Sequence, residues 1–425
     1  MPLENLKAEA AKAVDAMKAE LLALSHAIHG EPELAFQEFK AAKRLTEAVE
    51  SHDVAVARAA CGIKTAFAAE FGKNGGATVA ILSEYDALPG IGHSCGHNVI
   101  AAAGFGAAMA LSKLGAALPG RVRYLGTPAE ERFGGKEYMA RAGAFDGVDA
   151  AMMIHPASID MATMPCIAIS EVDVVYRGRA AHASAMPHRG LNALDAVMLA
   201  YQAIAALRQH IKATERIHGI ITEGGLAPNI VPERTACRFY VRAADVHELL
   251  TLRKRVHACF DAGARATGCE ADIVWGEANY LDLKTNWPIA RAFEKNAGAL
   301  GRKMVPTEKI PPFSSGSTDM GNVSHRVPSI HPMLAVAPPD VIIHNPEFAR
   351  WAASERGDAA VIDGAKALAM TALDVLANRE LRDHAKGDFA ASEDVSRLAI
   401  AQAFRARENG HSPAHAHGHG ACGCL

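Results

Sequence analysis

Short apolar runs that alternate with helix-forming segments constrain the fold of this chain more than any other feature. Such runs cover residues 77–83, 121–125 and 150–154, and segments with helical periodicity separate them. Because strands that alternate with helices build a largely parallel sheet, the first part of the chain is predicted to be an α/β domain. The helix between the first two runs is expected over residues 98–118, with Asn98 as its N-cap.

The pattern changes after residue 168. Six segments then follow in the order strand, helix, strand, strand, helix, strand: residues 169–176, 192–210, 219–222, 235–242, 246–262 and 271–275. That order is the signature of a ferredoxin-like α+β unit. Helix–strand alternation resumes near residue 286, so we predict an α/β domain interrupted by an inserted α+β domain. The predicted divisions are residues 1–168, 169–282 and 283–390, with a C-terminal extension over 391–425.

Composition and charge limit the classes of partner. Half of the 425 residues are hydrophobic and 21% are charged, with a formal net charge of −3, which is typical of a soluble globular protein with more than one domain. No basic stripe is present, so nucleic acid is not an expected partner. No apolar stretch is continuous enough to predict a membrane span, and the first residues lack the features of a secretory signal. Eight cysteines without regular spacing do not predict a disulfide framework, so a cytoplasmic location is expected.

The last fifteen residues, 411–425, are rich in histidine and cysteine. This composition is typical of a disordered tail that binds metal loosely. The final four residues match a prenylation motif in outline, but Gly423 and Cys424 are poor substitutes for its aliphatic positions. We therefore predict a flexible tail.

Thiol, imidazole and carboxyl side chains follow three successive predicted strands at the point where each strand ends. They are Cys95, His97, Glu130, Glu131 and His155. Each alone has an ordinary explanation, such as a buried cysteine, an acidic turn or a core histidine. The carboxyl ends of parallel strands, however, meet at one edge of the sheet, where α/β folds place ligands. These side chains are donors to zinc-like ions, so together they predict a metal site.

Two further groups of polar residues are candidates for the same site. His344 follows a late apolar run, but His325 and His331 lie nearby, and spacing alone does not choose among the three. The inserted segment contributes His182, Asn229 and Arg242. These residue types suit the binding of a carboxylate or a developing oxyanion, and each is equally compatible with an ordinary turn or surface position.

The order of these motifs resembles the co-catalytic dinuclear metallo-amidohydrolases and peptidases, a family that includes aminoacylases, carboxypeptidase G and indole-acetyl-amino-acid hydrolases. The segment Ser-Glu-Tyr-Asp-Ala-Leu-Pro-Gly at 83–90, followed by Cys-Gly-His-Asn at 95–98, is most similar to the branch with β-alanyl-lysine dipeptidase and the B subunit of p-aminobenzoyl-glutamate hydrolase. The resemblance covers about residues 15–380. It implies a zinc-peptidase-like catalytic domain with a mostly parallel central sheet, a ferredoxin-like insert that serves as lid and dimerisation domain, and hence a homodimer.

The resemblance also implies a role for each candidate residue. The implied metal ligands are Cys95, His97, Glu131, His155 and His344, the last through a late motif in which Asn345 replaces serine or threonine. Glu130 matches the general base, and Glu84 and Asp86 match outer residues that support the ligands. His182 matches a histidine that reaches the active site of the neighbouring subunit, and Asn229 and Arg242 match residues that bind the substrate carboxylate.

The implied reaction is hydrolysis of the amide bond of a small N-acyl amino acid or dipeptide with a free carboxylate, by a metal-activated water. Two divalent ions per chain are expected: Zn²⁺, with Mn²⁺ or Co²⁺ as alternatives, because Cys95 stands where many relatives place a bridging aspartate. One alternative is an aryl-amide hydrolase of the p-aminobenzoyl-glutamate type, and another is an inactive metal-binding protein. A Cys95–His97 nucleophile is a third, but it leaves Glu130 and Glu131 without a role.

Overall fold

The computed structural model of the protein describes residues 1–306, 309 and 316–404. Its body is built on a six-stranded sheet in the order β1-β2-β4-β3-β5-β11. The strands are β1 (Val56–Arg58), β2 (Phe67–Gly72), β3 (Thr78–Ser83), β4 (Arg121–Gly126), β5 (Ala150–Met152) and β11 (Ser329–Ile330). The pairs among β4, β3, β5 and β11 are parallel, and β1 and β2 add an antiparallel edge. The predicted α/β fold is therefore confirmed, with a mixed sheet.

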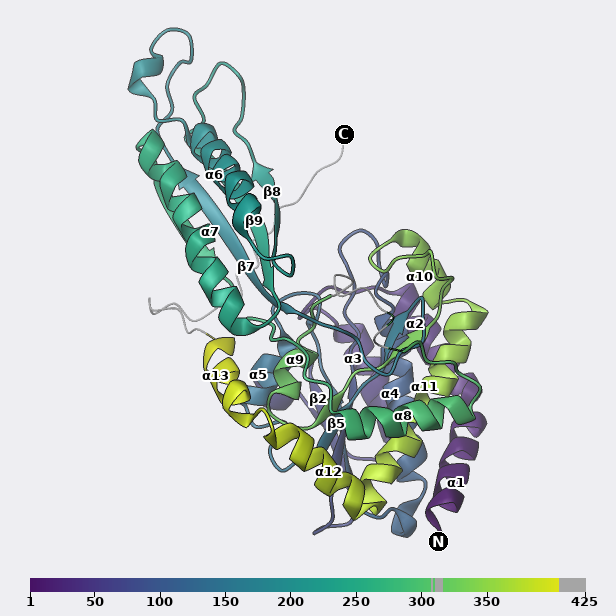
Figure 1. Cartoon of the computed structure of the whole chain (residues 1–425). Helices are drawn as coiled ribbons and strands as arrows, with labels where there is room; N and C mark the ends of the chain where they lie inside the picture. The colour runs from purple at the N-terminus through teal and green to yellow at the C-terminus, as the bar shows by residue number, and fades with distance from the viewer. Residues whose placement is uncertain (307–308, 310–315, 405–425) are drawn as a thin grey trace.

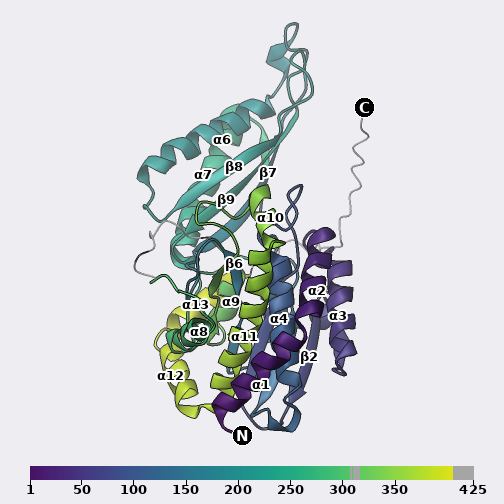
Figure 2. The same ribbon diagram turned by 90° about the vertical axis from the view of Figure 1, so that its right-hand side faces the viewer.

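Helices cover both faces of this sheet. The larger core joins one face to α1 (Leu3–Ala16), α2 (Lys18–Gly30), α3 (Phe39–Ser51), α4 (His97–Ser112), α8 (Trp287–Ala299), α10 (Pro346–Ala352) and α11 (Glu355–Ala377). A smaller core joins the other face to α5 (Gly135–Arg141) and α9 (Met320–Ser324). The helices α11, α4 and α1 lie side by side against the sheet in Figure 2.

Small residues allow α4 to lie at the centre of the body. A Cβ on Gly104 would meet Ser83 Oγ at 2.3 Å and the Leu82 carbonyl oxygen at 2.7 Å, so this position needs glycine, and Gly106 lets the Leu21 side chain approach closely. The predicted cap of this helix is wrong. Gly96, in the left-handed conformation, precedes the first helical residue, and the Asn98 amide donates instead to Ser25 Oγ and to the Ala352 carbonyl.

A second sheet is wholly antiparallel, in the order β10-β7-β9-β8. Its strands are β7 (Ala168–Arg177), β8 (Arg216–Glu223), β9 (Arg234–Ala243) and β10 (Glu270–Trp275), with α6 (Ala193–Leu207) and α7 (Val246–Thr267) between them in the chain. Alternate residues of β7 and β9 are buried against these helices. This β-α-β-β-α-β unit, residues 168–275, is called the inserted unit below. Its order matches the ferredoxin-like prediction, and the division of the chain at residues 168, 282 and 390 stays a prediction.

The inserted unit projects from the body as an elongated arm (Figures 1 and 2). β7 leaves the body at Ala168 and β9 returns to it at Ala243, because the two strands are antiparallel and these residues are paired. The loops 178–192 and 224–233 therefore lie at the far end of the arm, and we call them the tip loops.

Asn279 joins the arm, the body and the last described residues of the chain. Its Oδ1 accepts from Ser170 Oγ (2.5 Å) and from Arg253 Nη1 (2.8 Å), both in the inserted unit. Its amide Nδ2 donates to the Gln402 carbonyl at 2.7 Å, and its carbonyl accepts from Asn322 Nδ2 at 2.9 Å. Helix α13 (Glu393–Ala403), which follows α12 (Arg379–Ala390), packs beside this point.

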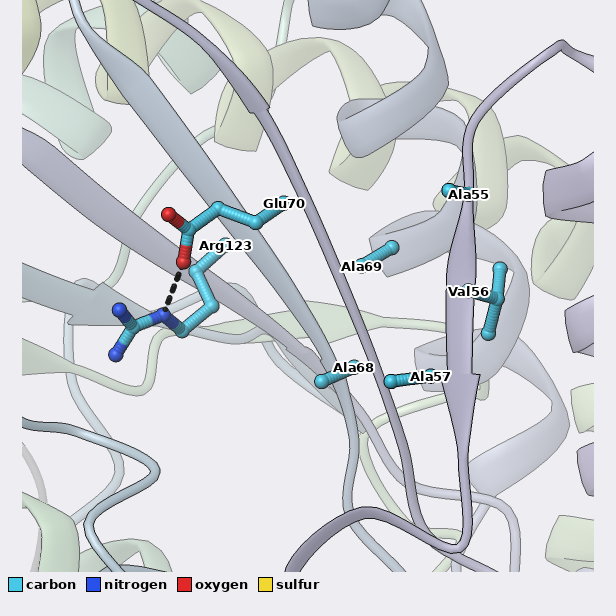
Figure 3. A pocket seen from close by; sticks show the side chains of 7 residues that line it. All are labelled: Ala55, Val56, Ala57, Ala68, Ala69, Glu70 and Arg123. Carbon is cyan, nitrogen blue, oxygen red and sulfur yellow. Dashed lines mark hydrogen bonds and ion pairs between the residues drawn. The ribbon is translucent and has the colours of Figure 1, made fainter. Parts of the chain in front are cut away.

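Other features of the chain bear less directly on the site. Within the described residues, no helix combines the length and apolar character that a bilayer crossing requires. The predicted His/Cys-rich tail lies outside the described residues. A shallow hollow beside β1 and β2 (Figure 3) is lined in part by an ion pair in which Arg123 Nε donates to Glu70 at 2.9 Å. None of the predicted site residues lines this hollow.

Candidate active site

The predicted metal-binding side chains converge at the carboxyl ends of β3, β4 and β5. Donor atoms within 4.8 Å of one another come from four overlapping groups: Cys95, His97 and His155; Cys95, Glu131 and His344; His97, Glu130 and Glu131; and Glu84, Asp86 and His97. The structure therefore brings together every residue that the resemblance implies as a ligand, together with the implied base. Their roles as ligands stay a proposal.

The loop after β3 orients His97 through Asp86. Gly96 has φ +81°, and a Cβ there would meet the Pro156 side chain at 2.9 Å, so only glycine fits this close to the segment that carries His155. The His97 ring is fully buried, and its Nδ1 lies 3.0 Å from Asp86 Oδ1. A carboxylate that fixes one ring nitrogen leaves the other, Nε2, directed into the cluster.

The loop after β4 presents Glu130 and Glu131 through contacts of their backbone. The Glu131 N–H donates to Asp86 Oδ2 at 2.9 Å, and the Glu130 carbonyl accepts from the Tyr280 hydroxyl at 2.6 Å. Asp86 thus supports a residue on each of two loops, which agrees with the supporting role implied by the resemblance. Both glutamate side chains are left free to point into the cluster.

The structure separates His344 from its two competitors. His344 has φ +63°, its N–H donates to the Ser94 carbonyl at 2.9 Å, and its Nε2 lies 3.5 Å from Glu131 Oε2. His325 instead contacts Ser396 and Asp282. His331 packs edge-on behind His155, with 5.3 Å between the ring centroids. Asn345, the departure from the family motif, caps α10 by accepting from the Glu347 N–H.

A buried lysine balances part of the acidic charge. Lys136 Nζ lies 2.8 Å from Asp319 Oδ1 and 3.2 Å from Glu84 Oε1, and all three side chains are fully buried. Glu84 Oε2 is in turn 3.7 Å from His97 Nε2. The lysine and Asp319 therefore form an ionic layer directly behind the candidate ligands.

Burial and mutual repulsion disfavour the charged forms of the cluster. Burial, followed by the Glu84 and Glu131 carboxylates, raises the pKa of Glu130 well above its usual range. Burial also raises the pKa of Glu131 to about 7, and burial with the Glu131 charge raises the pKa of the Cys95 thiol. Added positive charge would stabilise the anionic forms of this thiol and these carboxylates.

Divalent ions fit this cluster on two grounds. The buried atoms His97 Nε2 and Glu131 Oε1 have no hydrogen-bond partner among the described residues, although buried polar atoms are normally satisfied. Thiolate, imidazole and carboxylate are together the donor set of zinc-like ions. Cys95 Sγ and His155 Nε2, 3.4 Å apart, add two more donors on the same side.

The three polar residues of the inserted unit lie at opposite ends of it. Arg242, at the base of β9, donates to Ser317 Oγ at 2.8 Å, and Ser317 in turn donates to the Ile167 carbonyl. His182 and Asn229 are exposed in the two tip loops, where the Ala183 N–H donates to the Asn229 carbonyl. The ten residues of β9 span about 30 Å, so Asn229 and Arg242 of one chain do not reach the same carboxylate.

Sequence reasoning missed Lys136, Asp319 and Tyr280. Lys136 precedes Glu137 near the start of a short helix and looks like a solvated pair, and its partner Asp319 is 183 residues away. No local sequence pattern predicts an ion pair between residues so far apart. Tyr280 lies just beyond the last predicted strand of the insert, with nothing in its neighbours to mark it.

The comparison with known proteins decides the class of the protein. Residues 80–373 match peptidase family M20/M25/M40. The chain belongs to this family. The predicted class of enzyme, a metallo-amidohydrolase or peptidase with an α/β fold, is thereby confirmed.

Individual members of the M20 family are similar over most of the chain. The mouse protein named Xaa-Arg dipeptidase is 41% identical over 400 residues, 91% of this chain and 93% of its own. The B subunit of p-aminobenzoyl-glutamate hydrolase from Escherichia coli is 34% identical over 296 residues, 64% of this chain and 61% of its own. A dinuclear metal-binding M20 peptidase from Bacillus subtilis shares the fold, with a TM-score of 0.63 and 22% identity, over 85% of this chain and 99% of its own.

Proposed function

We propose that this protein is a dipeptidase that hydrolyses the amide bond of small dipeptides with a free carboxylate. The observation that supports this most is the convergence of Cys95, His97, Glu131, His155 and His344 around Glu130, in a chain similar over 91% of its length to an Xaa-Arg dipeptidase. Dipeptides that end in arginine are therefore the first substrates to test.

Five residues would hold the metal: Cys95, His97, Glu131, His155 and His344. We propose two ions, with Zn²⁺ favoured because of the thiolate and Mn²⁺ or Co²⁺ as alternatives. When bound, such ions polarise an amide carbonyl and lower the pKa of water to about 7.

Glu130 is the proposed general base. Its side chain lies beside the ligands, with its Oε2 3.8 Å from His97 Nε2. It would take the proton of the attacking water and return it to the leaving amine, a role that suits a carboxyl group whose pKa lies above its usual range. Arg242, at the base of the inserted unit, would bind the substrate carboxylate and so orient the scissile bond.

We further propose that the enzyme is a homodimer through the inserted unit. His182 and Asn229 lie at the tip of the arm, so they would complete a site only on another chain. β8 is an edge strand of its sheet and exposes Ile220 (63%), and helix α6 of the same unit exposes Met198 (47%) and Leu199 (46%). In the proposed symmetric dimer, a second copy of the chain would cover this edge strand and the exposed apolar side chains.

The cytosol stays the proposed compartment. The six cysteines within the described residues are all unpaired, which is typical of a reducing environment.

The deciding experiment measures metal content and turnover together. Alanyl-arginine, β-alanyl-lysine, p-aminobenzoyl-glutamate and N-acetyl amino acids are tested with and without a chelator. Two ions per chain and chelator-sensitive cleavage of the dipeptides support the proposal. Preferential cleavage of p-aminobenzoyl-glutamate supports the second candidate, which the 34% identity to one chain of that hydrolase favours. Bound metal without turnover of any amide contradicts both.

A further inference from the structure

We propose that Glu38 is a positioning residue that holds the loop of Glu130 and Glu131 in its active conformation. The inference rests on the proposed roles of those two glutamates. Glu38 lies far from them in the sequence, immediately before α3, and its side chain is fully buried.

The loop contains a residue in an unfavourable backbone conformation directly before the proposed base. Ala129 has φ +63°, and its carbonyl accepts from the N–H groups of Gly134 and Gly135 at 3.1 and 3.2 Å. The left-handed region reduces the population of a non-glycine residue by a factor of about 5 to 30. The surrounding structure must therefore hold Ala129 in place.

Glu38 is the side chain that does so. Its Oε1 accepts from the Ala129 N–H at 2.9 Å, and also from the N–H of Phe36, a second left-handed residue with φ +60°, at 2.9 Å. The Phe36 ring stacks on Phe133 of the same loop, with 5.6 Å between centroids. One carboxyl oxygen thus links the segment before α3 to the loop after β4.

The contacts of Glu38 are not those of an ordinary helix cap. Glu38 occupies the position before α3, where a side-chain oxygen normally accepts from the first turn, but its side chain makes no such bond. The next two residues of the loop are held from elsewhere, Glu130 by Tyr280 and Glu131 by Asp86. Glu38 therefore supplies the side-chain contact to Ala129, one residue before the base.

Four variants test this role: E38A, E38Q, A129G and the double variant E38A/A129G. Glycine adopts the left-handed conformation without the penalty, so A129G removes the need for Glu38. We expect E38A to lower kcat on the dipeptide substrate about tenfold at saturating Zn²⁺, with KM changed less than about threefold. Because Glu131 is in the same loop, the Kd for Zn²⁺, measured against a competing chelator, should rise about tenfold as well.

The controls separate positioning from general stability. E38Q keeps an acceptor oxygen, so kcat and the Zn²⁺ Kd should stay within about threefold of wild type, as should those of A129G. In the double variant, kcat and the Zn²⁺ Kd should return to within about threefold of the wild-type values. If E38A instead acted by a general loss of structure, the double variant would show the same losses as E38A. If E38A does not fold, E38M, which has similar volume and no oxygen acceptor, takes its place in both comparisons.

Two results would overturn the proposal: wild-type kcat and Zn²⁺ affinity in E38A, or equal losses in E38A and E38A/A129G. An absence of dipeptide turnover in the wild-type enzyme contradicts the proposed function instead. The Zn²⁺ measurements still test the role of Glu38 in that case, because they need no substrate.

Discussion

Lys136 Nζ lies 2.8 Å from Asp319 Oδ1, and both side chains are completely buried behind the candidate metal ligands. The lysine backbone N–H also donates to the other carboxylate oxygen of Asp319, at 2.9 Å. The lysine thus places a positive charge behind the candidate ligands, 3.2 Å from the Glu84 carboxylate.

Replacement of Lys136 by methionine should therefore destabilise the fold strongly. Loss of one partner leaves the buried Asp319 and Glu84 carboxylates uncompensated, which typically costs about 3–5 kcal/mol. The free energy of unfolding in urea measures the effect. Lys12→Met is the control: Lys12 pairs with Glu9 at the exposed surface, and its loss should leave the free energy of unfolding unchanged within error. A loss below about 1 kcal/mol for Lys136→Met would contradict the ionic role.

Substitution of the two adjacent glutamates should separate turnover from metal binding. Glu130→Gln should lower kcat by about 10²–10⁴-fold and leave the metal content unchanged, because only proton transfer is removed. Glu131→Gln should lose metal affinity, since it alters a proposed ligand. Mass spectrometry of the metals and steady-state kinetics measure both. Full turnover in Glu130→Gln would exclude Glu130 as the base.

Two inactive chains should restore activity to each other. Glu130→Ala removes the base, and His182→Ala removes a donor whose loss typically costs about 10²–10³-fold in rate. In a mixed dimer, the chain with an intact Glu130 meets the intact His182 of its partner, so random mixing should recover about a quarter of the wild-type activity. Each variant alone is the control. A mixture no more active than its components would contradict action of His182 on a second chain.

Acid should destabilise the metal-free protein through His331. Burial lowers the pKa of this histidine to about 3 in the folded state, below the value of about 6.5 in an unfolded chain. Between these values the unfolded state binds more protons than the folded state. The stability that the neutral His331 gives the folded protein is therefore complete above pH 6.5 and is lost as the pH falls towards 3. Below pH 6.5 the free energy of unfolding should fall less steeply with pH for His331→Gln than for the wild type. The two slopes should differ by up to about 1.4 kcal/mol per pH unit.

Urea unfolding of chelator-treated protein from pH 8.5 to pH 5 measures this difference in slope. Above pH 7.5 neither state takes up the proton, so the curves of the two proteins should run parallel there. Equal slopes below pH 6.5 would mean that His331 does not contribute.

The candidate ligands could be predicted because each follows an apolar run. Strands β3, β4 and β5 end at Ser83, Gly126 and Met152, and parallel pairing brings the following loops to one edge. This rule applies to any parallel sheet, and it needs only the short apolar runs that mark the strands. The choice of His344 depended on a family motif, and the structure supports it with a left-handed residue held by the Ser94 carbonyl.

The supporting contacts could not be predicted in the same way. Glu38, Lys136 and Asp319 act through partners 91 and 183 residues away, and such distances leave no periodicity in the sequence. The separation of Asn229 from Arg242 likewise follows from the extended length of β9, which a spacing of thirteen residues in the sequence does not reveal. Contacts between residues that are distant in the sequence determine where these side chains lie.

The bonds of Asn279 have a consequence for how the molecule melts. One side chain and its backbone tie the first strand of the arm, helix α7, helix α9 and the end of α13 to a single point. An arm on a free linker would lose its structure as an independent unit, in a separate calorimetric transition. With this shared anchor, arm and body are coupled, and heating should unfold them together in one cooperative step.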